Sequence, residues 1–345
     1  MQSNREWIER VRRHEDGPVP YNFMFSPPAQ RRVQAHYGAD LEAALGLPLR
    51  MTGCQSIKPL YADPQVFGPT VRDEYGVLWT TNPIDRGSPI GPCLREASLA
   101  GYRFPDPERA ERFAAIPAWC RQQAGHYRVV WVGDLWERAT FMRGMGELLL
   151  DVATAPAFVE ALLDGITAYV LATMRRLFAC GEFEAIAVSD DYGTQRAMVI
   201  SPAMWRRLVR PRLAQVYALA QAHGRAVFHH TCGHVLPIIG DLVDLGLDFL
   251  HPLQPEAMDP RVVKREFGAH LTLVGGISTQ QLLVHSSPAA VRAEVRRLQR
   301  ELGRGGGYIL EPGITLQDDV PVANMVAMID AARGRGQGQR RKTKQ

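Results

Sequence analysis

The chain has 345 residues, of which 46% are hydrophobic and 22% charged, a composition that excludes a fibrous or wholly disordered protein. Its formal net charge is +4 at pH 7, but the last 13 residues hold six Lys and Arg and no acid, so the rest of the chain carries −2. The charge balance therefore gives no electrostatic reason to expect a nucleic-acid partner.

The first part of the chain predicts one helix and one strand. Ser3 stands three residues before Glu6, the spacing of a capping box, and Ile8 and Val11 follow on one helical face. The β-prone run 19–25 predicts a strand that ends at the following Ser-Pro-Pro. The stretch from there to about residue 124 is rich in Gly and Pro, so we expect irregular excursions over one end of the fold.

From Tyr127 onward, short β-branched runs alternate with longer segments of helical period. Helices are expected to begin at Pro residues that follow a capping position, because Pro fits the first helical turn and Ser or Thr caps it. These starts are Thr154 before Pro156, Ser201-Pro202, Ser287-Pro288 and Val320-Pro321. The first of these helices carries an apolar stripe of Phe158, Leu162, Ile166, Val170, Met174 and Leu177, which we expect to pack on a sheet. The six further strands are predicted at 128–133, 185–190, 225–230, 247–252, 271–276 and 307–312.

Strands that alternate with helices imply a parallel sheet covered on both faces. Reactive or glycine residues end almost every predicted strand, as in a (β/α)8 barrel, whereas an open sheet would concentrate them at one switch point. We therefore predict an α/β fold, a distorted (β/α)8 TIM barrel, as a single domain over residues 1–332. The strand-end residues are Asp190 and Asp191, His230 and Cys232, His251 and Gln254, Gly275 and Gly276, and Glu311.

The two ends of the chain and its cysteines bear on its location. The basic segment 333–345 is expected to be a disordered tail, because Gly, Gln, Arg and Lys cannot build a core. No apolar run is expected to reach the ~18 residues that cross a bilayer, and the charged N-terminus is unlike a signal peptide. Five dispersed cysteines are too few for a disulfide framework in a chain this long. We expect a cytoplasmic protein with no membrane partner.

The densest chemical cluster is VFHHTCGHV, which places His230 and Cys232 at a strand end. On an extended backbone, residues two positions apart face the same side, so the imidazole and the thiol point together. This pair of ligands suits zinc. The spacing alone is weak support for a metal site, but its position at a strand end strengthens it.

Several motifs in order along the chain resemble the uroporphyrinogen decarboxylase superfamily, and more closely its methyltransferase branch, the methylcobamide:thiol methyltransferases and corrinoid-linked demethylases. The resemblance covers most of the chain from about residue 5 to 332. It is carried by DEYGVLW, LWERATFMRGMGELL, SDDYGTQRAMVISPAMWRRLVRPRL, FHHTCGHVLPIIGDLVDLGLDFLHPLQPEAMDPRVVKREFG, LTLVGGIST and GGGYILEPGITLQDDVPVANMVAMIDAA.

The resemblance implies a distorted barrel whose zinc-binding members take two ligands from an H-x-C pair, here His230 and Cys232. Their third ligand is a Cys in a P-G-C motif, and this chain has Ile314 in that place. Asp190, Asp191 or Glu311 could instead supply a carboxylate, and the alternative is that no tight metal binds. The same three acids are candidates for moving protons during catalysis.

The substrate pocket is expected to be lined in part by apolar groups. Phe23 and Phe25 replace the Arg-containing R-Q-A-G-R-Y stretch with which uroporphyrinogen decarboxylases hold substrate carboxylates, so a porphyrinogen is an unexpected substrate. Tyr192, Gln254 and the strand-end glycines Gly275 and Gly276 are further candidates for substrate binding.

The function expected from this resemblance is transfer of a methyl group between a small substrate and a corrinoid carried by a partner protein, possibly assisted by zinc on His230 and Cys232. A metal-independent decarboxylase or lyase of a small carboxylic acid is the alternative enzyme, with Asp190 or Asp191 as proton donor. A barrel that binds a small molecule without turnover is the third reading. The chain is expected to act as a monomer or homodimer.

Overall fold

Parallel strands joined by helices form the frame of the protein in a computed structural model that describes residues 3–334. The hydrogen-bonded order of the strands is β1-β5-β6-β7-β8-β9-β10, so that each strand neighbours the next one along the chain in this sheet. The pairs β5–β6, β6–β7 and β9–β10 are parallel. This topology is that of a (β/α) barrel and confirms the predicted fold class. The strands are β1 (Leu49–Gly53), β5 (Tyr127–Gly133), β6 (Ala185–Ser189), β7 (Ala226–His230), β8 (Phe249–Leu253), β9 (Thr272–Ile277) and β10 (Tyr308–Pro312).

Contacts divide the chain into two compact units. We call residues 50–250 the central unit, and the described parts of 1–49 and 251–345 the terminal unit. The last helix of the terminal unit ends at Ala332, where the predicted tail begins. Most of that tail, from residue 335, lies outside the described residues, so its predicted disorder stays a prediction.

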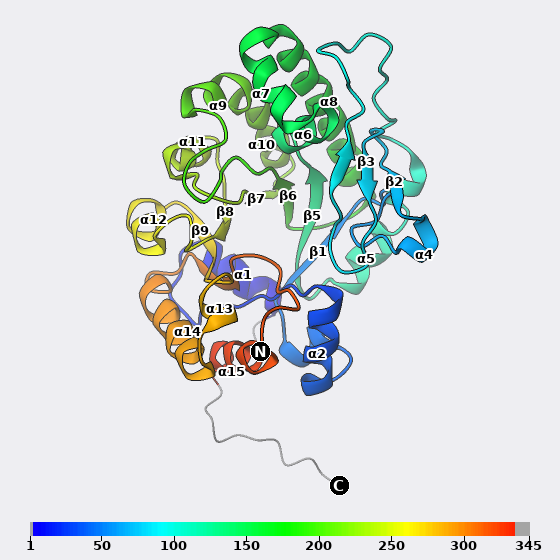
Figure 1. Ribbon diagram of the computed structural model, residues 1–345. Helices are drawn as coiled ribbons and strands as arrows, with labels where there is room; N and C mark the ends of the chain where they lie inside the picture. Colours follow the sequence, from blue (N-terminus) through cyan, green and yellow to red (C-terminus); the bar gives the residue numbers. More distant parts are fainter. Residues whose placement is uncertain (1–2, 335–345) are drawn as a thin grey trace. The chain divides into compact units, whose positions relative to one another are not determined.

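In the central unit, β5, β6 and β7 lie side by side and are almost wholly buried (Figure 1). Their runs of Val, Ile and Ala are apolar on both faces because helices cover the sheet. The helices of this unit are α4 (Pro64–Phe67), α5 (Ile116–Gln122), α6 (Trp136–Arg143), α7 (Met145–Thr154), α8 (Pro156–Cys180), α9 (Pro202–Leu208), α10 (Arg210–Ala222) and α11 (Ile239–Asp244), with 3-10 turns η1 (Ala110–Phe113) and η2 (Leu236–Ile238).

Helix α8 is the longest in the described chain, and all six residues of its predicted apolar stripe are buried. It is also long and apolar enough to cross a membrane by those two measures, with a mean hydropathy of 1.5, so the expectation that no run reaches that length is wrong. More than half of the 18-residue window, 56%, is buried inside the protein, as in a core helix. The predicted cytoplasmic location stays a prediction.

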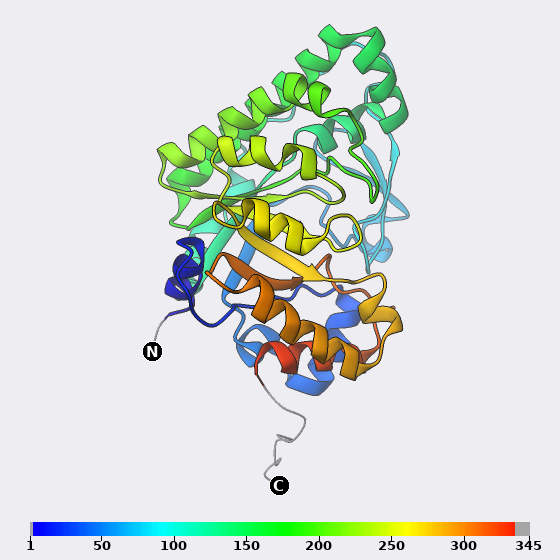
Figure 2. The ribbon, with the colours of Figure 1, turned by 90° about the vertical axis from the view of Figure 1, so that its left-hand side faces the viewer.

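In the terminal unit, helices α14 and α15 lie side by side, and α2 contacts α15 (Figure 2, orange and red). The helices of this unit are α1 (Asn4–Arg12), α2 (Pro27–Tyr37), α3 (Leu41–Leu45), α12 (Pro260–Phe267), α13 (Leu282–His285), α14 (Pro288–Leu302) and α15 (Val322–Ala332).

The N-terminal segment confirms the predicted helix and corrects the predicted strand. The Ser3–Glu6 capping box is present, and it begins α1. The run 19–25 forms no strand, only isolated bridges from Tyr21 to Leu310 and from Phe25 to Leu316. The flanking prolines explain the difference, because Pro residues donate no backbone hydrogen bond to a ladder.

Residues 26–124 are more regular than predicted. They hold strand β1, helices α2 to α5, and a separate antiparallel sheet of β2 (Thr70–Arg72), β3 (Leu78–Thr80) and β4 (Pro89–Gly91). The elements of this stretch are only three to eleven residues long, too short for a clear hydrophobic period. The prediction of irregular excursions over this stretch is therefore wrong.

Three of the four helix starts marked by Pro are confirmed, with one wrong cap, and at the fourth Pro321 is the N-cap residue while α15 begins at Val322. Ser201 and Ser287 accept hydrogen bonds from the backbone amides of Met204 and Ala290, as N-caps do. Thr154 instead belongs to α7, where its hydroxyl donates to a carbonyl one turn back, and α8 begins without a side-chain cap.

Candidate metal site

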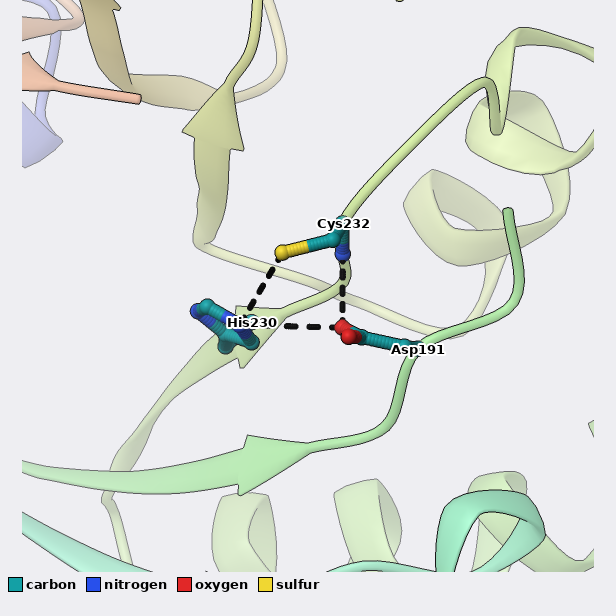
Figure 3. A group of neighbouring side chains, drawn as sticks. All are labelled: Asp191, His230 and Cys232. Atoms are coloured by element: carbon teal, nitrogen blue, oxygen red, sulfur yellow. Dashed lines mark hydrogen bonds and ion pairs between the residues drawn. The ribbon is translucent and has the colours of Figure 1, made fainter. Parts of the chain in front are cut away.

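The ends of β6 and β7 bring together Asp191, His230 and Cys232 (Figure 3). Asp191 comes from the loop after β6, His230 ends β7, and Cys232 lies two residues further on. The loops approach closely because Gly193 and Gly233 face each other; a Cβ on Gly233 would lie 2.4 Å from the carbonyl oxygen of Gly193. The predicted His230–Cys232 pair therefore gains one of the predicted carboxylates.

Two of the three distances between the ligand atoms match the spacing around a zinc ion. His230 Nε2 lies 3.4 Å from Cys232 Sγ and 3.6 Å from Asp191 Oδ1, and one ligand atom from each residue lies within 4.8 Å of the others. Zn–N, Zn–S and Zn–O bonds of about 2.0, 2.3 and 2.1 Å in a tetrahedron put the ligand atoms roughly 3.4–3.6 Å apart. The donor set of one nitrogen, one sulfur and one oxygen fits zinc in its chemistry, and the two distances from His230 fit the tetrahedral spacing.

The site is held in a form that suits a cation. Burial lowers the pKa of His230, so the imidazole is neutral near pH 7 and keeps a lone pair for a metal. Burial and the Asp191 carboxylate raise the pKa of the Cys232 thiol, so the thiolate needs a nearby cation to form. The Cys232 amide donates to Asp191 Oδ1 at 2.8 Å and so fixes the carboxylate beside the sulfur.

Asp190, the neighbour of Asp191, faces the opposite way and is fully buried. Its carboxylate accepts hydrogen bonds from the amides of Trp136 and Glu137 at the start of α6, and from the hydroxyl of Tyr192. Its own amide donates to the carbonyl of His230. Burial raises the pKa of Asp190 to about 8, against the effect of these hydrogen bonds. Asp190 therefore ties together β6, β7 and α6, and its predicted catalytic role stays a prediction.

The other residues on this buried side are aromatic or histidine. The hydroxyl of Tyr217 lies 2.7 Å from Nδ1 of His229, and the rings of Tyr192 and His229 lie 5.5 Å apart. Burial lowers the pKa of His229 to about 3, so this imidazole is neutral. Tyr192, predicted to bind substrate, is fully buried in this network.

An ion pair lies close to the candidate metal site. Arg86 Nη2 lies 2.8 Å from Oε1 of Glu137, and the Arg86 charge acts on both Asp191 and His230. Burial raises the pKa of Glu137 to about 7, although Arg86 opposes the shift. Sequence analysis missed this pair, because a lone Arg in an irregular loop carries no signal of where it folds.

A cavity of about 950 Å3 opens in the central unit between the small sheet, β5 and α6. Trp131 of β5 lines it, and the ring of Trp131 lies 6.2 Å from that of His230. Trp131 therefore links the cavity to the candidate metal site, although Asp191, His230 and Cys232 are not among the residues that line the cavity. Its other aromatic lining residues are Phe67, Trp79 and Phe141, and the rings of Trp79 and Phe141 lie 4.9 Å apart. Trp131 and Phe141 therefore line this cavity with aromatic surface.

The remaining predicted site residues lie in the terminal unit. Glu311 is 2% exposed, accepts a hydrogen bond from Asn22, and has an oxygen 3.8 Å from Nε2 of His251. Burial raises the pKa of Glu311 to about 8, so the acid holds a proton near pH 7. Its predicted roles as metal ligand and proton carrier stay predictions. Ile314, in the place of the family's third cysteine, is 38% exposed and offers no ligand atom.

The predicted substrate-binding residues of this unit are largely packed. Phe23 is buried and stacks on Tyr21 with ring centroids 5.6 Å apart. A Cβ on Gly275 would lie 2.6 Å from the backbone nitrogen of Leu253, so this glycine allows β8 and β9 to approach closely. A role of these glycines in substrate binding is not needed to explain them. The predicted substrate contacts of Phe23, Phe25, Gln254, Gly275 and Gly276 stay predictions.

The fold of this chain is shared with a solved structure, a methyltransferase from Methanosarcina mazei. The two superpose with a TM-score of 0.69, over 97% of this chain and 99% of the other, at 17% sequence identity. At this identity the likeness establishes the fold alone.

Sequence comparison identifies the family. Two curated relatives carry the name uroporphyrinogen decarboxylase. The protein from Psychromonas ingrahamii is 23% identical over 245 residues, 66% of this chain and 65% of the relative. The protein from Alkalilimnicola ehrlichii is 26% identical over 262 residues, 70% of this chain and 67% of the relative, so the chain spans about two thirds of the length of each. The uroporphyrinogen decarboxylase (URO-D) family matches residues 129–335, more than half of the chain, and this protein therefore belongs to that enzyme family.

Proposed function

We propose that this protein is a methyltransferase that moves a methyl group between a small substrate and a corrinoid carried by a partner protein, with a zinc ion held by Asp191, His230 and Cys232. The observation that carries the proposal is the meeting of these three ligand atoms within 4.8 Å of one another at two strand ends. The methyl and corrinoid chemistry is supported by the motifs shared with the methyltransferase branch and by the likeness to the M. mazei methyltransferase.

When bound, zinc would act as a Lewis acid that lowers the pKa of a coordinated thiol or oxygen nucleophile. The protein's own residues prepare the site for it. Cys232 holds Asp191 in place through its amide, and Asp190 fixes the strand ends through its bonds to the start of α6 and to the His230 carbonyl. The ring of Trp131 packs edge-on near His230, with 6.2 Å between the ring centroids.

Asp191 replaces a sulfur ligand with an oxygen, which makes the site harder than a site with two thiolates. The substitution of the family's P-G-C cysteine by Ile314 is thus compatible with a metal site in this chain. A harder donor set should bind Zn2+ or Co2+ and should discriminate less strongly in favour of Cd2+.

The metal content of the purified protein tests the proposal. Wild-type protein is expected to hold about one zinc per chain. The Cys232→Ser and His230→Gln variants should lose it, and the matched control Cys180→Ser, which changes another free thiol of the central unit, should retain it. Equal, negligible zinc in the wild type and all variants would overturn the metal part of the proposal.

Methyl transfer itself is tested with methylcobalamin and a panel of small thiols, by following loss of the methylcobalamin absorbance. In this direction the methyl group leaves cobalt without its bonding electrons, the thiolate sulfur attacks it, and the cobalt is left as Co(I). Turnover should need zinc and Cys232. No turnover by the zinc-loaded protein with methylcobalamin or a corrinoid protein would contradict the methyltransferase proposal.

Decarboxylation of a small carboxylic acid is the second candidate, and two observations favour it. The curated relatives carry the name of a decarboxylase. Glu311 and Asp190 are buried acids whose pKa is raised to about 8, so either could hold a proton near pH 7. This candidate predicts CO2 release that survives chelation and the Cys232→Ser change, which the methyltransferase does not.

A further inference from the structure

Arg112 is a buried arginine of the central unit, and no carboxylate of residues 3–334 lies within ion-pair distance of it. It is 7% exposed. Three arginines of the same unit that are equally buried each pair with an acid: Arg128 with Glu184, Arg143 with Asp151 and Arg212 with Asp164. A buried charge without a partner is costly, so proteins pair such groups or use them on a ligand.

The guanidinium of Arg112 is held in position, but only one of its three nitrogens donates hydrogen bonds to the described residues. Nη1 donates to the carbonyl of Pro107 at 2.6 Å and to the hydroxyl of Thr173 at 3.3 Å. The group lies 5.0 Å from the ring centre of Tyr169. Nε is buried without a hydrogen-bond partner, and Nη2 has none among the described residues. These two nitrogens form the side of the guanidinium that binds a carboxylate with two parallel hydrogen bonds.

Arg112 lines the 950 Å3 cavity, and two further cations without an acidic partner among the described residues line it as well. Lys58 donates only to the backbone carbonyls of Pro59 and Arg86. The side chain of Arg109 is exposed and makes no hydrogen bond or ion pair within residues 3–334. The remaining cations of the lining are already paired, Arg86 with Glu137 and Arg138 with two aspartates.

The acids of the lining do not neutralise Arg112. Asp73 and Asp134 are engaged by Arg138. Glu74 accepts a hydrogen bond from Ser56 and makes no ion pair among the described residues, and Glu111 is exposed. The lining also holds the aromatic side chains Trp79, Phe141 and Trp131. Lys58 Nζ lies 4.8 Å from the ring centre of Trp79, so one of the free cations is next to an aromatic wall.

We infer that this cavity binds an organic acid, whose carboxylate is received by Arg112 and whose apolar or aromatic body lies against the tryptophan and phenylalanine walls. The cavity is of the size that holds a small organic ligand, roughly 300–1,000 Å3. That this organic acid is the substrate of the enzyme rests on the proposed function, because Trp131 joins the cavity to the candidate metal site. That the cavity binds an organic acid does not depend on the proposed function.

Binding of three matched probes tests the inference: 3-phenylpropanoate, the neutral 3-phenylpropanamide and the cationic 3-phenylpropylammonium. Affinity is measured by calorimetry and by the fluorescence of the tryptophans, on full-length protein freed of metal with a chelator. The acid should bind at least about tenfold more tightly than the amide, because a hydrogen-bonded charge pair contributes about 1.5–3 kcal/mol. The ammonium probe should bind most weakly. Equal affinity for all three probes, tightest binding of the ammonium, or no binding of the acid at millimolar concentration would overturn the inference.

Variants assign the effect to the arginine. Arg112→Met should weaken binding of the acid at least about tenfold and leave the amide unchanged. Because Arg112 also packs on Tyr169 and could be needed for folding, the exposed Arg109→Gln and the half-buried Lys58→Gln supply folded variants, each expected to weaken the acid about twofold to fivefold. Arg176→Gln, on the exposed side of α8, is the matched control and should change nothing.

The outcome separates this inference from the proposed function. The Cys232→Ser variant should bind the acid as tightly as the wild type, since the cavity cations do not depend on the metal. Acid binding in a protein that holds no zinc would leave the inference standing while the metal proposal fails. If the wild type holds zinc normally and a folded Arg112→Met protein still binds the acid as tightly as the wild type, the metal proposal stands and this inference fails.

Discussion

Two pairs of adjacent residues, Asp190 with Asp191 and His229 with His230, show opposite environments at the same strand ends. Asp190 and His229 are fully buried in a network with Tyr192 and Tyr217. The side chains of Asp191 and His230 are 36% and 22% exposed and face the candidate metal site. His229 and His230 face opposite sides because side chains alternate along a strand, whereas Asp190 and Asp191 are separated by the course of the loop after β6.

This contrast separates stability from function. A buried carboxylate that accepts three hydrogen bonds holds the fold together, because its loss leaves three buried donors unsatisfied. A partly exposed carboxylate that accepts one hydrogen bond from an amide adds little to the free energy of unfolding, but it can coordinate a metal. The variants below test the contrast.

Replacement of Asp190 should have the largest effect on stability. The Asp190→Ala variant is expected to lose about 3–5 kcal/mol of unfolding free energy, since the amides of Trp136 and Glu137 and the Tyr192 hydroxyl lose their acceptor. Urea denaturation of the metal-free protein measures it. Asp191→Ala, the matched control, should lose no more than about 1.5 kcal/mol, and equal losses would break the contrast.

Replacement of His230 should have the largest effect on metal binding. His230→Gln is expected to weaken zinc affinity at least about 100-fold, as a lost ligand should cost more than a lost outer-shell partner. Competition with a chromophoric chelator gives the affinities. The adjacent change His229→Phe should reduce stability by about 1–3 kcal/mol, because the Tyr217 hydroxyl loses its partner, and should leave zinc affinity within a few fold. Parallel loss of zinc in both variants would show that the two faces are not independent.

Removal of the metal should destabilise only proteins that can bind it. Zinc at 100 times its dissociation constant is expected to stabilise the wild type by about 2.7 kcal/mol relative to the chelated protein. Thermal unfolding with and without chelator measures the difference. The Cys232→Ser protein should unfold at the same temperature under both conditions, and a shift as large as that of the wild type would place the metal elsewhere.

Replacement of Tyr217, at the edge of the buried network, should have the smallest effect on stability. Tyr217→Phe removes one hydrogen bond to His229 and should cost about 1 kcal/mol of unfolding free energy, with zinc content unchanged. Chemical denaturation and metal analysis of the same preparation check both parts. A loss of zinc here would mean that the buried network controls the metal site directly.

The sequence predicted the part of the fold in which local and tertiary signals agree. Buried β-branched runs and Ser-Pro helix starts located β5 to β10 and helices α9 and α14, because both faces of the strands are apolar and each cap is a local hydrogen bond. Ser26 before Pro27 also precedes a helix, α2, but Ser26 makes no side-chain cap hydrogen bond, and the sequence predicts only the end of a strand there. The predicted cap at Thr154 is wrong because its hydroxyl donates to a carbonyl within α7 instead of capping α8.

Only the part of the candidate site that follows from the alternation of side chains along a strand could be predicted from the sequence. His230 and Cys232 lie two residues apart on one strand end, so their common direction follows from the backbone alone. The choice between Asp190 and Asp191 depends on how the loop after β6 turns, which no local pattern in the sequence shows. Arg86 and Arg112 come from segments without a clear period, and only the fold brings them to the cavity.

X-ray absorption spectroscopy of the zinc-loaded protein tests the central claim, that Asp191, His230 and Cys232 share one metal ion, most directly. The predicted spectrum has one sulfur at about 2.3 Å and nitrogen or oxygen ligands at about 2.0–2.2 Å, with the sulfur contribution absent from a Cys232→Ser protein. Zinc surrounded by nitrogen and oxygen alone in the wild type, or a sulfur contribution that persists in the variant, would contradict it.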